Sequence, residues 1–279
     1  IYFQTNLEEL VVDSAIFPEM NDENAPIALE RLRRFTALAA QFGIDVYLDL
    51  KTGYFKMFSE AVYERFPEIR TFPKWGNHPC GGRQVVLDFY HETLRNTFRV
   101  APDLKGIIII YDTEGFYSCF LHNKKDQCPY CKDFTVEQLS SRLFNTLLDA
   151  IRTYRQDTEL VLWSYFCDEP WNFRVLEAMP ADVSIMSCFS QFRKLDRFGI
   201  QVLTDDYSIC SEDPSEYFLK IQEIANRKGL RLIAKTEDTF GQEFVSTPYT
   251  PCLTQHQRRW DQVHRQSIDG YLAQYIHLG

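Results

Sequence analysis

The amino-acid sequence predicts an α/β protein of the (β/α)8 TIM barrel class, with residues 1–279 forming one domain of catalytic type. The first observation is that apolar segments of strand length alternate with amphipathic segments of helix length along the chain. The second is that 279 residues with 45% hydrophobic content can bury one large core. The third is that no internal repeat or low-complexity linker divides the chain. A doubly wound open sheet is the alternative arrangement of the same elements.

Seven segments have the composition of buried strands. In residues 106–114, four consecutive isoleucines indicate a strand that is apolar on both faces, as in a parallel sheet covered by helices. We expect an eighth, short and irregular strand near residues 75–82, and an additional strand or hairpin in residues 201–209. The seven clear strands are residues 1–6, 45–51, 106–114, 159–166, 183–189, 231–237 and 270–277.

Helical periodicity fills most of the intervening sequence. Residues 135–155 form the clearest helix, and Thr135 stands at the position of a helix N-cap. Residues 25–43 place apolar side chains at helical spacing and end in Gly. The apolar positions of that helix are Ile27, Leu29, Leu32, Phe35 and Leu38. The other expected helices are residues 59–66, 83–101, 214–229 and 254–267.

The charge of the chain argues against one class of partner. The net charge is −9 and no basic run could follow a phosphate backbone, so we expect no nucleic-acid partner. No apolar run is long enough to span a bilayer, so we expect no membrane partner. Since residue 1 already lies in an apolar segment, we expect the domain to come from a longer protein with flanking domains.

Polar residues come in pairs at the carboxyl ends of four predicted strands. Side chains two residues apart in a strand share a face, so the members of each pair point the same way. In a (β/α)8 barrel these ends meet at one mouth, which is where barrel enzymes carry their sites. For any single pair, a salt bridge or a solvated strand end is the better explanation, but four pairs at the same end favour a site. The pairs are Gln4 with Asn6, Asp49 with Lys51, Asp112 with Glu114, and Lys235 with Glu237.

Two carboxyl groups at such a mouth suit the hydrolysis of glycosides. One carboxyl protonates the departing glycosidic oxygen, and the other stabilises or attacks the anomeric carbon. We predict Glu114 as the acid, because repulsion from Asp112 would hold a proton on the pair. Sugars also stack on flat aromatic faces, although core packing explains the same residues. The predicted carbohydrate-binding residues are Asn6, Asp49, Lys51, Trp163, Tyr165, Tyr207 and Lys235.

Several segments resemble the catalytic barrel of glycoside hydrolase family 20 and its uncharacterised bacterial relatives. They are AAQFGIDVYLDL (39–50), FPEIR (66–70), APDLKGIIIIYDTEG (101–115), CPYCKDFTVEQLSSRLFNTLLDAIR (128–152) and AKTEDTFGQEFVSTPYTP (234–251). The resemblance implies cleavage of terminal β-linked N-acetylhexosamines, with the substrate's acetamido oxygen as nucleophile. It implies Glu114 as the acid and Asp112 as the residue that orients the acetamido group. The family has this Asp and Glu adjacent, whereas Thr113 separates them here.

Two other functions fit the same residues. One is a retaining glycosidase that acts by double displacement, with Glu114 as acid and Glu237 as nucleophile. The other is a barrel that binds carbohydrate without catalysis. No cofactor is required for catalysis in any of these interpretations.

A cluster of metal-ligand residues lies in the sequence CFLHNKKDQCPYC (119–131). Three thiolates and one imidazole can form a tetrahedral structural zinc site. We therefore expect Cys119, His122, Cys128 and Cys131 to be the ligands if zinc binds. The alternative is that these cysteines bind no metal.

Overall fold

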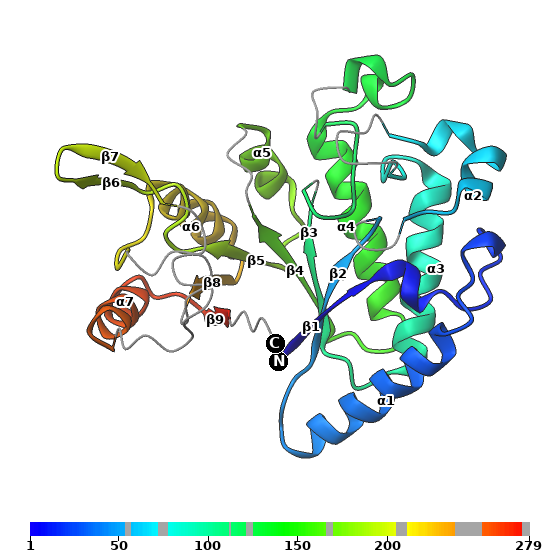
Figure 1. Ribbon diagram of the computed structural model, residues 1–279, viewed down its shortest axis with the longest axis horizontal. Helices are drawn as coiled ribbons and strands as arrows, with labels where there is room; N and C mark the ends of the chain where they lie inside the picture. Colours follow the sequence, from blue (N-terminus) through cyan, green and yellow to red (C-terminus); the bar gives the residue numbers. More distant parts are fainter. Residues whose placement is uncertain are drawn as a thin grey trace. The chain divides into compact units, whose positions relative to one another are not determined.

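The computed structural model describes residues 1–53, 57–71, 78–111, 113–120, 125–165, 170–204, 211–237 and 253–274. Seven of the nine strands in these residues alternate with helices in a fold of the (β/α)8 barrel class, which confirms the predicted fold class (Figure 1). The chain divides into two compact units. Unit 1 comprises Ile1–Trp163 with Ala178–Val183, and unit 2 comprises Ser164–Glu177 with Ser184–Gly279. That the chain forms a single domain stays a prediction.

Unit 1 contains a parallel sheet whose strand order follows the chain. The order is β1 (Tyr2–Asn6), β2 (Tyr47–Lys51), β3 (Gly106–Ile110) and β4 (Glu159–Ser164). Every neighbouring pair of these strands is parallel. A parallel sheet in chain order needs a crossover between successive strands, and helices supply it, as in barrels.

The isoleucine run forms strand β3. Ile107–Ile110 are at most 5% exposed, so the strand is buried on both faces, as predicted. The strand ends at Ile110, however, so the predicted strand 106–114 is too long. Glu114 therefore lies on a loop, and Phe116 in that loop has a left-handed φ of 49°. Strand alternation does not determine where Glu114 points, because alternation holds only within a strand.

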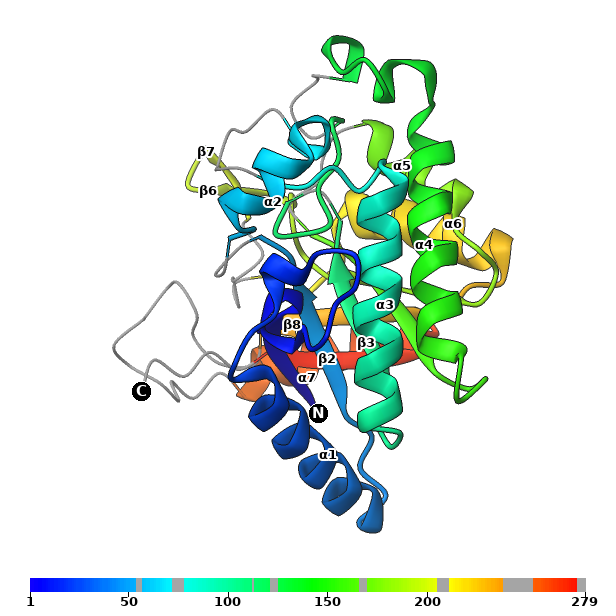
Figure 2. The same ribbon diagram turned by 90° about the vertical axis from the view of Figure 1, so that its right-hand side faces the viewer.

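The four helices of unit 1 in the described residues lie around this sheet. They are α1 (Ala25–Gln41), α2 (Glu60–Arg65), α3 (Gln84–Val100) and α4 (Val136–Arg152). Helices α3 and α4 run side by side, as Figures 1 and 2 show. The predicted cap of α4 is confirmed, because the backbone N–H of Gln138 donates to Thr135 Oγ1 at 3.2 Å. Short 3-10 turns span Leu7–Leu10, Pro18–Met20, Pro67–Ile69, Lys125–Gln127 and Cys131–Asp133.

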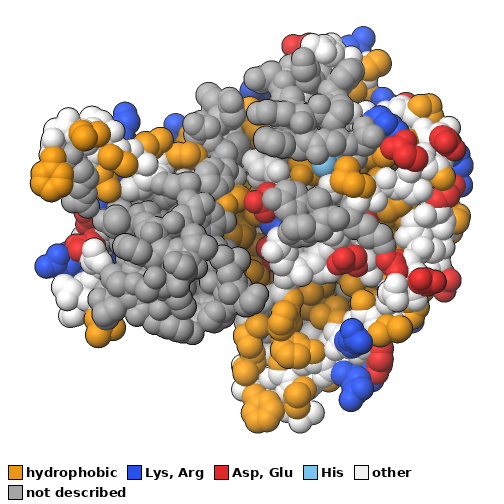
Figure 3. Space-filling view, in the orientation of Figure 1, with side chains coloured by type: hydrophobic (Ala, Val, Ile, Leu, Met, Phe, Trp, Pro, Cys, Tyr) orange, Lys and Arg blue, Asp and Glu red, His pale blue; other side chains and the backbone are white. Residues whose placement is uncertain are grey.

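The apolar face predicted for α1 is partly wrong. Leu29 is buried, but Ile27 is 53% exposed, Phe35 is 39% exposed and Leu38 is 53% exposed. The helix buries Ala25, Thr36 and Ala39 instead, which are small enough for close packing. Figure 3 shows the resulting hydrophobic surface over α1.

The predicted strand near residues 75–82 is also wrong in the part that the structure describes. Residues 78–82 contain only one isolated bridge, in which Pro79 lies antiparallel to Arg70. This segment contains Pro79, Gly81 and Gly82, which favour turns over strands. The isoleucine run is consequently the third strand of its sheet and not the fourth.

Unit 2 contains a second set of parallel strands, in the order β5 (Val183–Cys188), β8 (Leu232–Glu237) and β9 (Gly270–Gln274). Its helices are α5 (Pro170–Ala178), α6 (Glu216–Lys228) and α7 (Leu253–Arg265). Strands β6 (Lys194–Arg197) and β7 (Ile200–Leu203) form an antiparallel hairpin. The additional strand or hairpin predicted in residues 201–209 overlaps it only at 201–203, and residues 205–210 lie outside the described residues. Within the residues that the structure describes, no helix combines the length and the apolar character needed to cross a bilayer.

Candidate functional site

A buried ion cluster lies at the carboxyl end of β2. The ammonium of Lys51 is 3.2 Å from Asp49 Oδ1 and 2.9 Å from Glu114 Oε2. Asp49 and Lys51 share a face of β2 because they are two residues apart in the strand. We call Asp49, Lys51 and Glu114 the β2 ionic cluster.

The three side chains of the β2 ionic cluster differ in exposure. Lys51 is 1% exposed and Asp49 is 4% exposed, whereas Glu114 is 23% exposed. Burial raises the pKa of the Asp49 carboxyl, and the charge of Lys51 opposes this shift. Of the three groups, Glu114 is the one that a ligand in solvent can reach. Lys51 contacts Glu114 directly, and Asp49 contacts Lys51.

Close backbone packing fixes the loop that carries Glu114. The N–H of Phe116 donates to Thr52 Oγ1 at 2.7 Å. A Cβ on Gly115 would lie 2.9 Å from the backbone nitrogen of Thr52 and 3.3 Å from Lys51 Cα. Only glycine allows this approach, so Gly115 lets the loop lie directly against the end of β2.

Two other predicted residues of unit 1 lie beside Lys51. Asn6 of β1 is opposite Lys51 in the strand register and is 1% exposed. The ammonium of Lys51 lies 5.8 Å from the ring centroid of Trp163, which pairs with Ile110 of β3 in register. Trp163 is only 4% exposed, so in this structure its ring packs against the protein.

The remaining predicted residues are in unit 2 or outside the described parts. Tyr165 is 6% exposed, and Lys235 is fully buried in β8 opposite Cys188 and Leu272. Glu237 is the last residue of β8, and its side chain is outside the described set. The four polar pairs are divided between the two units, so one mouth shared by all of them stays a prediction. Asp112, His122 and Tyr207 lie outside the described residues.

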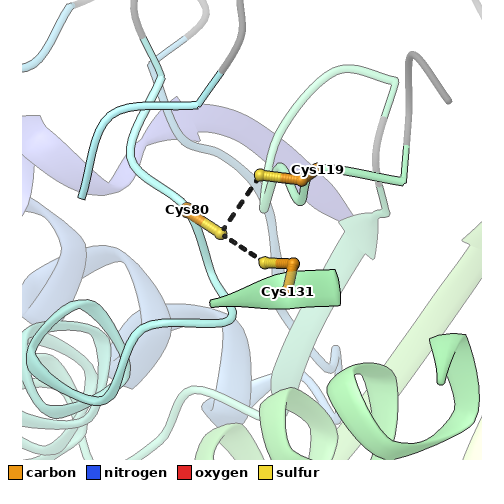
Figure 4. Close-up of side chains that lie close together, drawn as sticks. All are labelled: Cys80, Cys119 and Cys131. Atoms are coloured by element: carbon orange, nitrogen blue, oxygen red, sulfur yellow. Dashed lines mark hydrogen bonds between the residues drawn. The ribbon is translucent and has the colours of Figure 1, made fainter. Parts of the chain in front are cut away.

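A cluster of thiols forms a second candidate site in unit 1. Cys119 and Cys131 lie together, as predicted from their spacing, and Cys80 joins them. The side chains of the three point toward one another in Figure 4. Hydrogen bonds from the thiols of Cys119 and Cys131 hold the pKa of Cys80 well below its ordinary range. Cys80 is not among the ligands predicted from the sequence, although Cys-Gly-Gly at 80–82 is a turn signal beside a cysteine.

Sequence comparisons do not assign the chain to a family. No protein-family model matches it. An isocitrate dehydrogenase kinase/phosphatase from Polaromonas naphthalenivorans (strain CJ2) is 28% identical to it over 142 residues. That match covers 50% of this chain and 21% of the curated relative.

Structural comparisons show the fold. A GH138 enzyme that targets pectin rhamnogalacturonan II superposes with a TM-score of 0.61 and 11% sequence identity. The match covers 98% of this chain and 28% of that chain. TcOYE, an old yellow enzyme from Trypanosoma cruzi solved with pHBA, has a TM-score of 0.50 and 10% identity, and the match covers 97% of this chain and 74% of that chain. The chain therefore has a barrel-class fold that enzymes of different chemistry share, and it spans less than a third of the GH138 enzyme.

Proposed function

We propose that the chain belongs to the catalytic part of a glycoside hydrolase and that Glu114 carries its reacting carboxyl. The β2 ionic cluster is the observation that carries this proposal. In this cluster the carboxyl of Glu114, which a ligand can reach, contacts the buried ammonium of Lys51 at the carboxyl end of a parallel strand. The likeness in fold to the GH138 enzyme supports the proposal only by analogy, since the old yellow enzyme has a similar fold.

In the proposed reaction, the protonated carboxyl of Glu114 donates its proton to the glycosidic oxygen, the bond from this oxygen to the anomeric carbon breaks, and the leaving group departs as a neutral alcohol. This leaves a carboxylate on Glu114. The Lys51 ammonium, 2.9 Å away, stabilises that carboxylate. Asp49 in turn balances part of the charge of Lys51 from its buried position. Water then adds to the anomeric carbon and returns one proton to Glu114.

The finer assignments rest on the sequence. Exo-acting cleavage of β-linked N-acetylhexosaminides, with Asp112 orienting the acetamido group, follows from the resemblance to family 20. Double displacement is the alternative, and it requires the carboxyls of Glu114 and Glu237 to be about 5 Å apart.

The test compares Glu114→Gln with a matched control. Glu19 is 26% exposed and pairs with Arg65 at 3.1 Å, so Glu19→Gln removes a similarly exposed, ion-paired carboxylate elsewhere in unit 1. On glycosides with poor leaving groups, Glu114→Gln should lower turnover by about 100-fold or more, because the leaving oxygen then needs a proton. On activated aryl glycosides the loss should be much smaller, and Glu19→Gln should behave as wild type on both.

The substrates are pairs of glycosides with and without an N-acetyl group. If Glu114→Gln retains wild-type turnover on an unactivated glycoside, Glu114 is not the acid. If the wild-type protein binds sugars but cleaves none of the substrates, the non-catalytic interpretation holds. Cleavage that requires the N-acetyl group would support the family 20 mechanism.

A further inference from the structure

Four cysteines from three separate segments of unit 1 meet in one buried cluster. Cys80, Cys119, Cys128 and Cys131 pack together against Leu139, and each is at most 6% exposed. All four are free thiols. We propose that they bind one zinc ion as four thiolates, in a structural site that does not involve His122.

The sulfur positions fit a tetrahedral metal site. A Zn–S bond of about 2.3 Å places the sulfurs of a tetrahedral site about 3.8 Å apart. Cys80 Sγ lies 3.5 Å from Cys131 Sγ and 3.8 Å from Cys119 Sγ (Figure 4). These three sulfurs all lie within 4.8 Å of one another. Three vertices of the tetrahedron are therefore already in place.

The fourth vertex falls to Cys128, whose sulfur is outside the group of three that lie within 4.8 Å of one another and must move toward them when the metal binds. The Cys128 sulfur accepts the backbone N–H of Cys131 at 3.4 Å and interacts with the thiols of Cys119 and Cys131. The Cys128-x2-Cys131 turn thus directs its two sulfurs to the same side. Two cysteines separated by two residues are the usual ligand spacing of structural zinc sites. The backbone N–H of Gly82 donates to the Cys80 sulfur in the same way. Such N–H donors stabilise thiolates.

Gly82 shows that the turn after Cys80 is fitted closely to the cluster. A Cβ on Gly82 would lie 3.3 Å from Cys131 Sγ and 3.4 Å from Cys80 Sγ. It would also lie 3.1 Å from Leu139 Cδ2. A side chain here would press on the sulfurs, so the second glycine of Cys-Gly-Gly keeps Cys80 at ligand distance from Cys131.

The surroundings can balance the charge of a thiolate site. Four thiolates and one Zn²⁺ carry two net negative charges, and the four thiols release their protons when the metal binds. Arg83 directly follows the Cys-Gly-Gly turn, and its guanidinium lies 4.4 Å from the ring centroid of Tyr130. Arg142 donates to the carbonyl of Gly82 at 3.2 Å and to the hydroxyl of Tyr130 at 2.7 Å. Two cations thus border the cluster.

The metal would join the Glu114 loop to the two other segments that carry the cluster cysteines. Cys119 lies on that loop, and the N–H of Gly81 donates to the carbonyl of Tyr117 at 2.8 Å. The rings of His78 and Tyr117 stack with their centroids 3.7 Å apart. These segments have little regular secondary structure, so a metal supplies stability that a larger apolar core would otherwise provide. Four protein ligands leave no open position, so the role is structural.

The first test is the metal content and coordination of the full chain purified without chelator. We expect one zinc ion per chain, with X-ray absorption showing four sulfur neighbours at about 2.3 Å. Absence of metal, iron in place of zinc, a nitrogen ligand, or disulfides between these cysteines in mass spectrometry would each overturn the proposal.

The second test compares four variants by zinc content and thermal unfolding. Cys80→Ser should lose zinc and unfold at a lower temperature, and Cys128→Ser should behave in the same way. Cys188→Ser is the control, because Cys188 is a buried thiol in β5 outside the cluster. His122→Ala should keep a full zinc content. Zinc loss in His122→Ala, or full retention in Cys80→Ser, would contradict the all-thiolate site.

Discussion

The β2 ionic cluster makes Lys51 the most informative position for a stability experiment. Lys51→Met keeps the length of the side chain and removes the ammonium that lies between Asp49 and Glu114. Asp49, which is 4% exposed, then stays buried without its opposite charge, whereas Glu114 can still be hydrated. Breaking a buried ion pair in this way costs about 3–5 kcal/mol of unfolding free energy.

The assay is urea unfolding at neutral pH, followed by the fluorescence of the four tryptophans. Lys51→Met combined with Asp49→Asn should regain more than half of the lost stability, because the buried group is then neutral. Lys105→Met is the matched control. Lys105 also contacts two carboxylates in unit 1, Asp157 at 3.3 Å and Glu159 at 3.7 Å.

Exposure distinguishes the two lysines. Asp157 is 60% exposed and Glu159 is 26% exposed, so solvent screens both ion pairs and the loss in Lys105→Met should be several times smaller. Equal losses in Lys51→Met and Lys105→Met would refute the argument from burial. A double variant as unstable as Lys51→Met would show that packing, and not charge, determines the loss.

Two further predictions concern stability alone. Burial raises the pKa of the Asp49 carboxyl in the folded state above its ordinary value of 3.8. This carboxyl therefore adds most to the unfolding free energy below pH 3.8, and that contribution falls as the pH rises through the folded pKa. In urea unfolding, the unfolding free energy of Asp49→Asn relative to wild type should therefore increase between about pH 4 and pH 7. A difference that is constant with pH would contradict the raised pKa of Asp49. Thr135→Ala should lower the unfolding free energy by about 1 kcal/mol through loss of the α4 cap, and Thr135→Ser, which keeps the acceptor oxygen, should not. Equal losses in these two variants would argue against the cap.

The elements with a strong local signal could be predicted from the sequence. The isoleucine run of β3 and the cap of α4 depend on neighbouring residues, and the structure shows both. Asp49 and Lys51 meet because alternation within one short strand determines their common face. These features need no knowledge of the rest of the chain.

The features that sequence reasoning got wrong or missed depend on distant contacts. The predicted strand end at Glu114 is wrong because the loop after Ile110 turns back to Thr52, which the local sequence does not reveal. Ile27, Phe35 and Leu38 have helical spacing, but tertiary packing chooses Ala25, Thr36 and Ala39 for the buried face of α1. Cys80 lies 39 residues before Cys119, so a search for close ligand spacing could not find it.

The edge of the unit 1 sheet has a consequence for work with the protein in solution. Among the strands that the structure describes in this unit, β1 pairs only with β2, and Phe3 at this edge is 41% exposed next to the apolar surface of α1. Strand edges beside apolar side chains tend to pair with strands of other molecules. Such self-association stabilises the folded chain by mass action, so the midpoint of unfolding would rise with protein concentration. Free energies for the variants above are therefore comparable only when they are measured at one low concentration.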